Sequence, residues 1–230
     1  MINTNIIIAD ISHWQEPGSI DWKIAHDKSG VRGAIVKLVQ NGVADPAHIQ
    51  HLYDAYEGGV ECLGVYDFGT ETDDVQDFIA DALTEFQGSL STRLLVLDAE
   101  KSSAQITVPE CENWVQAVHD KSERWPLVYM GRSGPDGTGK GLPSKVLSNC
   151  SLWLPAYGPH EENLGNILPP GWRMPQNDTD SAGVCRLWQF TGDGINAPSN
   201  WPAGIPPKCD LSYPVGFSSF DSFRRWWETL

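Results

Sequence analysis

Short aliphatic runs alternate with segments of helical periodicity over the first 150 residues of the chain. Continuous apolar runs are typical of strands buried on both faces, and apolar residues spaced three and four apart are typical of helices that cover such strands. The predicted strands span 6–10, 33–39, 62–68, 94–97 and 127–130. Because a helical segment follows each strand, the pattern predicts parallel strands joined by crossover helices.

Capping residues predict where the first helices begin and end. One helix is predicted near 21–27. The next is predicted with Asp45 as N-cap, Pro46 at the first helical position and Gly58 as the stop. Its apolar residues at helical spacing are Ile49, Leu52, Tyr53 and Tyr56.

The third predicted helix is the most periodic segment of the chain. Apolar residues recur at helical spacing over 75–86, with Thr72 as the cap and Gly88 as the stop. A capping-box sequence at 107–110 predicts a fourth helix. A weaker pattern near 142–147 predicts a short fifth helix.

The pattern changes after residue 151. Strands are predicted at 152–157, 184–190 and 209–213, but the connecting segments are rich in proline, which breaks helices. Because parallel pairing normally needs a long crossover, the last strands are expected to run antiparallel. The chain ends with an amphipathic helix that carries Phe223, Trp226, Trp227 and Leu230, which we interpret as packing residues.

These elements predict an α/β fold, a modified TIM-like barrel with about five regular strand–helix units and an irregular last third. A chain of 230 residues lies within the range that such barrels occupy as one domain. We therefore expect residues 1–230 to form a single catalytic barrel domain.

The segment RLLVLDAE, residues 93–100, places two carboxylates at the end of a predicted strand. Side chains alternate across a strand, so Asp98 and Glu100 share one side and lie roughly 6.5–7 Å apart along the backbone. In a barrel the C-terminal ends of the strands share one face, and that face carries the active site. Asp10 and Asp210 belong to the first and last predicted strands, so four acids are expected to meet there.

Aromatic and polar side chains are predicted on the same face. They are Lys37, Tyr66, Asp67, Tyr129, Trp153, Tyr157, Trp188 and Gln189. Acids among large rings favour glycoside hydrolysis, in which one protonated carboxyl group donates to the leaving oxygen while other carboxylates stabilise positive charge on the sugar. Lys37 is interpreted either as a counter-charge to the acids or as a surface lysine.

Motifs in a fixed order give the chain a family resemblance. They are DISHWQ and IDW near the N-terminus, then VYDF, LVLDAE, VYMG, LWLPAY, LWQF and CDLS at successive predicted strands. This order resembles the family 25 glycoside hydrolases, the Chalaropsis-type lysozymes that are common as bacteriophage endolysins. The resemblance implies a (β/α)5(β)3 barrel. It also implies an N-acetylmuramidase that cleaves the β-1,4 bond between N-acetylmuramic acid and N-acetylglucosamine in bacterial peptidoglycan.

The resemblance also implies roles for the site residues. Glu100 matches the general acid and Asp98 its partner acid, and burial beside rings and other acids is expected to raise the pKa of Glu100. Asp10 and Asp210 match acids that orient the substrate, its acetamido group or water. The residues that match positions lining the saccharide groove are Tyr66, Trp153, Tyr157, Trp188 and Gln189.

Two positions depart from the family pattern. Asp67 stands where family members usually have His in Y-H-F, and Gln40 stands where they usually have Glu in K-A-T-E-G. Both are expected in the groove, so they bear on which glycan variants are accepted.

Charge and apolar patterning exclude several partners. The formal net charge of −14 opposes binding to nucleic acid or to an anionic membrane. No run approaches the 18 or so apolar residues of a membrane span, and the N-terminus lacks the features of a signal peptide. We expect a monomer that is made in the host cytoplasm and acts on the cell wall after release, as phage endolysins do.

The cysteines and acids leave two alternative functions open. Five widely separated cysteines, without a C-x-x-C pair, predict neither a zinc site nor a disulfide framework, and no cofactor or metal is expected. Clustered acids on a barrel rim would also suit a metal-dependent phosphodiesterase. A non-catalytic barrel that binds cell-wall saccharides is the other alternative.

Overall fold

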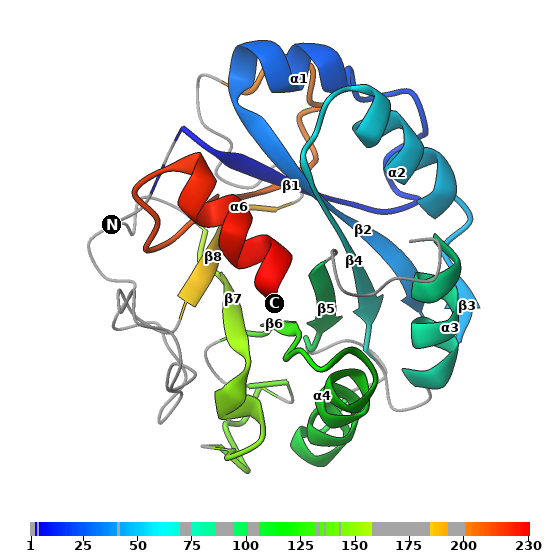
Figure 1. The fold of residues 1–230 in the computed structure, drawn as a ribbon, viewed down its shortest axis with the longest axis vertical. Helices are drawn as coiled ribbons and strands as arrows, with labels where there is room; N and C mark the ends of the chain where they lie inside the picture. Colours follow the sequence, from blue (N-terminus) through cyan, green and yellow to red (C-terminus); the bar gives the residue numbers. More distant parts are fainter. Residues whose placement is uncertain are drawn as a thin grey trace.

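Eight of the described strands close into a barrel (Figure 1). The computed structural model describes residues 3, 5–40, 42–69, 75–85, 94–100, 106–131, 134–135, 137–142, 144–157, 185–192 and 201–230. The strands of the ring are β1 (Ile7–Ile11), β2 (Val31–Gln40), β4 (Cys62–Phe68), β5 (Leu94–Asp98), β6 (Leu127–Tyr129), β7 (Ser151–Pro155), β8 (Cys185–Thr191) and β9 (Asp210–Pro214). A short strand, β3 (Val43–Ala44), pairs with the end of β2 outside the ring. This architecture confirms the predicted α/β barrel.

Strand direction changes only at the last strand of the ring. Neighbouring strands from β1 through β8 pair in parallel, whereas β9 is antiparallel to both β8 and β1. The antiparallel prediction is therefore confirmed for β9 and wrong for β7 and β8. The connection that spans 156–184 is long enough for a crossover, which permits parallel pairing of β7 with β8.

Helices α1 (Trp22–Ser29), α2 (His48–Glu57), α3 (Val75–Glu85) and α4 (Val108–Ser122) lie outside the ring, on the side formed by β2, β4 and β5 (Figure 1). The predicted capping box of α4 is present: Thr107 Oγ1 accepts from the backbone N–H of Glu110, and the Glu110 carboxylate accepts from the backbone N–H of Thr107. No helix in the described part of the chain is long and apolar enough to span a membrane.

The second helix differs from its prediction in both its start and its buried face. It begins at His48, and the Asp45 carboxylate instead accepts from the backbone N–H of Ala47 before the helix starts. The buried residues are His48, His51, Leu52 and Ala55, while Ile49, Tyr53 and Tyr56 are exposed. The apolar spacing predicted the wrong face because buried histidines make hydrogen bonds that a hydrophobic pattern does not reveal.

The predicted fifth helix near 142–147 is wrong for the residues described there. The segment contains only a short 3₁₀ turn, η1 (Leu147–Asn149), and the Ser144 hydroxyl accepts from the backbone N–H of Leu147 at 3.1 Å. Competition of such side chains with backbone hydrogen bonds favours turns over helices. The predicted cap at Thr72 and stop at Gly88 lie outside the described residues.

The C-terminal helix α6 (Phe220–Thr229) packs against the apolar interior of the barrel. Figure 1 shows it crossing the barrel in front of the strands. Phe223 and Trp227 belong to the same buried cluster as Ile8, Leu94 and Leu127, which come from three different strands. The prediction that this helix supplies packing residues is confirmed.

Trp227 connects α6 to strand β4. Its indole N–H donates to the carbonyl of Leu63 at 3.1 Å, and its side chain is 1% exposed. Gly64 makes room for the ring, since a Cβ there would lie 3.2 Å from the Trp227 ring and 2.9 Å from the Leu94 carbonyl oxygen. Trp227 therefore packs in the interior of the barrel and joins the last helix to β4.

We expect Trp227→Ala to lower the free energy of unfolding by about 3–5 kcal/mol, because it leaves a cavity and an unsatisfied Leu63 carbonyl. Urea unfolding monitored by circular dichroism measures the loss. Tyr56→Ala, at a 63% exposed position on α2, is the control and should change stability by less than about 0.5 kcal/mol. A loss below about 1 kcal/mol for Trp227→Ala would contradict the packing role.

Candidate active site

A cleft of about 240 Å³ opens at the C-terminal ends of the parallel strands. Nine of the twelve site residues predicted from the sequence line it: Asp10, Lys37, Tyr66, Asp98, Glu100, Tyr129, Tyr157, Gln189 and Asp210. They come from seven of the barrel strands and from the segments that follow β5 and β7. The barrel thus gathers residues that are up to 200 positions apart in the chain.

Strand register brings the four acids to this cleft. Asp10 on β1 lies directly opposite Asp210 on the antiparallel strand β9. Asp98 ends β5, and its backbone carbonyl accepts from the N–H of Gly69 at 2.9 Å. The next backbone N–H, that of Ala99, donates to the Tyr129 carbonyl at 2.8 Å. Backbone contacts to both neighbouring strands therefore fix the segment that presents Asp98 and Glu100.

Burial and mutual repulsion change the proton affinity of the cluster. Burial raises the pKa of Asp10 well above its usual range, and the charges of Asp210 and Glu100 raise it further. Burial likewise raises the pKa of Asp98, with added repulsion from Glu100 and Asp10. One carboxylate oxygen of each of these two aspartates has no hydrogen-bond partner among the described residues. The cluster therefore holds protons at pH values at which free aspartates are ionised.

Lys37 is the counter-charge to these acids. Its side chain is 5% exposed, so the surface-lysine interpretation is wrong. The ammonium donates to Gln40 Oε1 at 3.0 Å and lies 4.0 Å from Asp45 Oδ2. Burial lowers the pKa of Lys37, while the acids around it oppose that shift, and its charge in turn lowers the pKa of Asp10 and Asp98.

Hydrogen bonds join the cleft wall formed by β6, β7 and β8 to Asp210. Gln189 Oε1 accepts from the hydroxyl of Tyr129 at 2.7 Å and from that of Tyr157 at 3.2 Å. Gln189 Nε2 donates to Asp210 Oδ2 at 3.2 Å. Two tyrosines and one amide therefore fix the position of one of the acids.

The structure places Asp67 and Trp188 outside the cleft, contrary to the sequence expectation. Asp67 is fully buried and accepts from the indole N–H of Trp114 on α4 at 2.8 Å. The Trp188 indole donates to the Ala156 carbonyl at 2.7 Å and packs in the outer core. Neighbouring residues of a strand face opposite sides, so Tyr66 and Gln189 face the cleft while Asp67 and Trp188 face away.

Trp153 faces the barrel interior but does not line the cleft. Its ring is 1% exposed and meets the Tyr129 ring edge-on, with centroids 4.9 Å apart. Its indole N–H donates to the Ser212 hydroxyl at 2.9 Å. This residue belongs to the packed interior of the barrel and has no surface open to a sugar.

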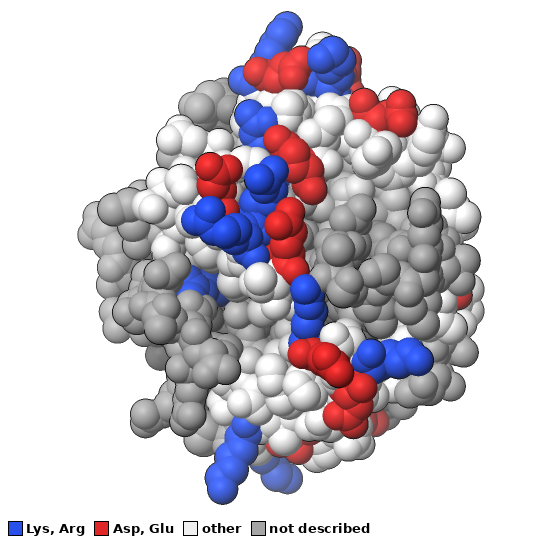
Figure 2. All heavy atoms as spheres, viewed as in Figure 1, with Lys and Arg blue, Asp and Glu red and all other residues white. Residues whose placement is uncertain are grey.

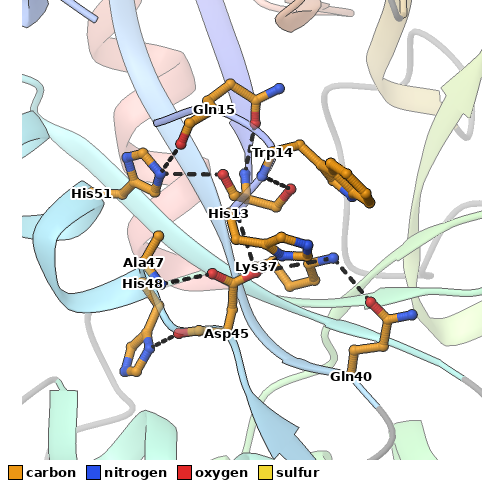
Figure 3. Close-up of polar contacts among 10 residues, drawn as sticks. His13, Trp14, Gln15, Lys37, Gln40, Asp45, Ala47, His48 and His51 are labelled. Carbon is orange, nitrogen blue, oxygen red and sulfur yellow. Dashed lines mark hydrogen bonds and ion pairs between the residues drawn. The ribbon is translucent and has the colours of Figure 1, made fainter. Parts of the chain in front are cut away.

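Further cleft residues, which were not predicted from the sequence, lie at the end of β1, in the loop after it and on β4. Ile11, Ser12, Trp14, Gln15 and Phe68 also line the cleft. The DISHWQ motif was the available signal, because loops that follow barrel strands lie on the active face. Figure 3 shows this loop next to Lys37, Gln40 and Asp45.

No group of three or more His, Cys, Asp or Glu side chains within the described ranges is arranged to hold a metal ion. All five cysteines are free and buried. Burial raises the pKa of the Cys185 and Cys209 thiols to about 12, so they are poor metal ligands and poor nucleophiles.

Asp98→Asn should stabilise the protein at neutral pH by about 0.5–2 kcal/mol, because burial and the neighbouring acids disfavour the ionised form of Asp98 and the neutral amide removes that cost. A raised native pKa means that the folded state binds protons more tightly than the unfolded state, so the cost of Asp98 grows as pH rises above the ordinary aspartate pKa of 3.8. The gain should therefore shrink as pH falls toward 3.8.

Unfolding free energies at pH 7 and pH 4 measure this difference. Glu16→Gln, which changes an exposed acid, is the control and should show no such trend. A variant that is less stable than the parent protein at pH 7 would contradict the electrostatic account of the cluster.

The chain is similar to known hydrolases in sequence and in structure. The model of "Glycosyl hydrolases family 25" matches residues 9–197. No curated protein sequence matches the chain. Among solved structures, a muramidase from Trichobolus zukalii is 21% identical with a TM-score of 0.68, and the match covers 98% of this chain and 100% of that one.

Two further structures show the same fold. The bacterial lysozyme from Streptomyces coelicolor is 16% identical with a TM-score of 0.70, and the match covers 97% of each chain. The catalytic domain of an endolysin from a Listeria monocytogenes bacteriophage is 19% identical with a TM-score of 0.61, covering 100% of this chain and 98% of that one. Because the family model spans most of the chain, the sequence resemblance is confirmed. The protein belongs to glycosyl hydrolase family 25 and is a glycoside hydrolase.

Proposed function

We propose that this chain is a peptidoglycan hydrolase of the lysozyme type, which cleaves the β-1,4 bond between N-acetylmuramic acid and N-acetylglucosamine. The observation that carries the proposal is the meeting of Asp10, Asp98, Glu100 and Asp210 in one cleft with Lys37 beside them. The proposal assigns the activity to one catalytic domain, residues 1–230. The similar structures described as muramidase, lysozyme and endolysin support this choice of substrate.

Glu100 is the proposed general acid. It is only half-buried, so it has access to a bound glycan, and it lies beside the more deeply buried Asp98. Its carboxyl proton passes to the glycosidic oxygen as the bond from that oxygen to the anomeric carbon breaks. Water then adds to the anomeric carbon, and its proton returns to the Glu100 carboxylate.

The other acids stabilise the positive charge that develops on the sugar ring. Asp98 is the proposed partner acid, and Asp10 and Asp210 are proposed to orient the substrate or water. Lys37 limits how many protons the cluster holds, because its charge favours the ionised forms of Asp10 and Asp98. Tyr66, Tyr129, Tyr157 and Gln189 are the proposed contacts to the glycan.

Fragment analysis tests the proposal directly. Purified peptidoglycan is digested with the protein, and the products are identified by mass spectrometry. Reducing N-acetylmuramic acid ends support a muramidase. Reducing N-acetylglucosamine ends, or release of peptides alone, would overturn the bond assignment, and glycan binding without new reducing ends would favour the non-catalytic alternative.

Glu100→Gln should lower the rate of glycan cleavage by at least about 10²-fold, because the amide keeps the shape of the side chain but has no transferable proton. Initial rates of reducing-end release measure this, and the melting temperature should not fall, because the substitution also removes a charge that repels Asp10 and Asp98. Glu57→Gln, an exposed residue at the end of α2, is the matched control. Activity within a few-fold of the parent protein would remove Glu100 from this role.

The surface charge decides how the protein meets an anionic cell wall. On the face shown in Figure 2, Lys and Arg side chains are interspersed with Asp and Glu. Arg32 pairs with Glu61 at 3.2 Å, and Arg224 lies 3.9 Å from Glu228. With a net charge of −14, long-range steering toward an anionic wall is neutral or repulsive.

We therefore expect added salt to leave the rate of lysis of intact cells unchanged or to raise it, because screening reduces repulsion. The measurement is the lytic rate from low to physiological ionic strength. A steep fall would reveal a functional basic patch, and Arg224→Glu combined with Arg225→Glu would then show whether the terminal helix carries it.

A further inference from the structure

The loop between β1 and α1 presents a tryptophan at the cleft. Trp14 lines the cleft and is 79% exposed, whereas Trp153 and Trp188 are almost completely buried. From this contrast we propose that Trp14 is a stacking platform for a sugar ring of the glycan strand. The proposal rests on the proposed function and extends it by naming a residue that binds substrate away from the reacting bond.

Helix α2 anchors the loop that carries Trp14. His51 Nε2 lies 3.2 Å from the carbonyl oxygen of Ser12 and 2.9 Å from that of Gln15, so one buried ring bridges both ends of the loop (Figure 3). Asp45 Oδ2 accepts from the backbone N–H of His13 at 3.1 Å. These contacts fix the backbone on both sides of Trp14.

Further hydrogen bonds hold the loop from within. The backbone N–H of Ser12 donates to Gln15 Oε1 at 2.9 Å, and the N–H of Gln15 donates to the Ser12 carbonyl at 3.0 Å. The N–H of Trp14 donates to the Ser12 hydroxyl at 3.4 Å. A loop with this many internal contacts loses little conformational freedom when a ligand binds.

The indole itself is supported from one side. The His13 ring lies against it with centroids 4.8 Å apart at an interplanar angle of 34°. His13 is held in turn, because its Nδ1 lies 2.7 Å from the buried carboxylate of Asp45. The remaining surface of Trp14 is exposed and borders the cleft, as Figure 3 shows for its position beside His13 and Lys37.

These observations fit a binding role better than a packing role. A ring that is 79% exposed removes little apolar area from water, so it adds little to folding. An indole offers a broad, flat face that suits the C–H face of a pyranose ring. Peptidoglycan glycan strands continue beyond the cleaved bond, so a platform at the cleft edge holds the strand in register.

The test compares three variants on soluble, peptide-free glycan strands prepared from peptidoglycan. Trp14→Ala should raise KM about tenfold with kcat changed less than about threefold, since the stacking contact is remote from the reacting bond. Trp14→Tyr keeps an aromatic face and should retain most of the affinity. Tyr56→Ala removes an exposed aromatic ring on the outside of α2 and should behave as the parent protein.

Melting curves accompany each assay, and all three variants should unfold at the parent temperature because both rings are exposed. A parent-like KM for Trp14→Ala, with normal cleavage products, would overturn the platform and leave the proposed function intact. An equal rise in KM for Tyr56→Ala would also overturn it, since the effect would then not belong to the cleft. A parent protein that releases no N-acetylmuramic acid ends would overturn both.

Discussion

Attraction between the buried Lys37 ammonium and the surrounding carboxylates allows this barrel to hold several acids in one cleft. Burial and repulsion raise the pKa of Asp10 and Asp98, and Lys37 opposes both shifts. Asp45 Oδ2 lies 4.0 Å from the Lys37 ammonium and opposes the lowering of its pKa by burial. Contacts therefore link the loop after β1 to Asp45 and Lys37, and the charge of Lys37 acts in turn on Asp10 and Asp98. A change in any of these groups alters the proton content of the whole site.

Side chains alternate between the two faces of each strand, and this alternation decides which of them reach the cleft. Asp10, Lys37, Tyr66 and Asp98 all occupy inward positions at the same end of the barrel. The reversed direction of β9 adds Asp210 opposite Asp10, which a parallel strand in that register would place differently. The antiparallel last strand therefore contributes an acid to the site from its first residue.

The same alternation explains how far the sequence could predict the structure. Continuous apolar runs predicted the strands, and acids at the ends of those runs predicted the cleft, because both signals lie in short stretches of sequence. Asp67 and Trp188 were wrongly placed although each adjoins a correctly placed neighbour, and strict use of the two-residue period would have excluded them. The depth of Trp153 depends on which side chains lie above it, and the exposure of Trp14 depends on anchors from α2. Neither is encoded in local periodicity.

The contribution of Asp45 to stability and that of the buried pair Asp10 and Asp98 change with pH in opposite directions. Burial alone would raise the pKa of Asp45, but hydrogen bonds from His13 and Ala47 outweigh burial and lower this pKa. The contribution of Asp45 to stability is therefore fully present above pH 3.8, the ordinary aspartate pKa, and is lost only as the pH falls below it. Because the pKa values of Asp10 and Asp98 are raised, protonation relieves the repulsion between these carboxylates at pH values above 3.8, the ordinary aspartate pKa. As pH falls from neutrality, the acids therefore take up protons while Asp45 still anchors the loop. Protonation of Asp10 and Asp98 therefore precedes loss of the Asp45 contacts that hold the loop carrying Trp14.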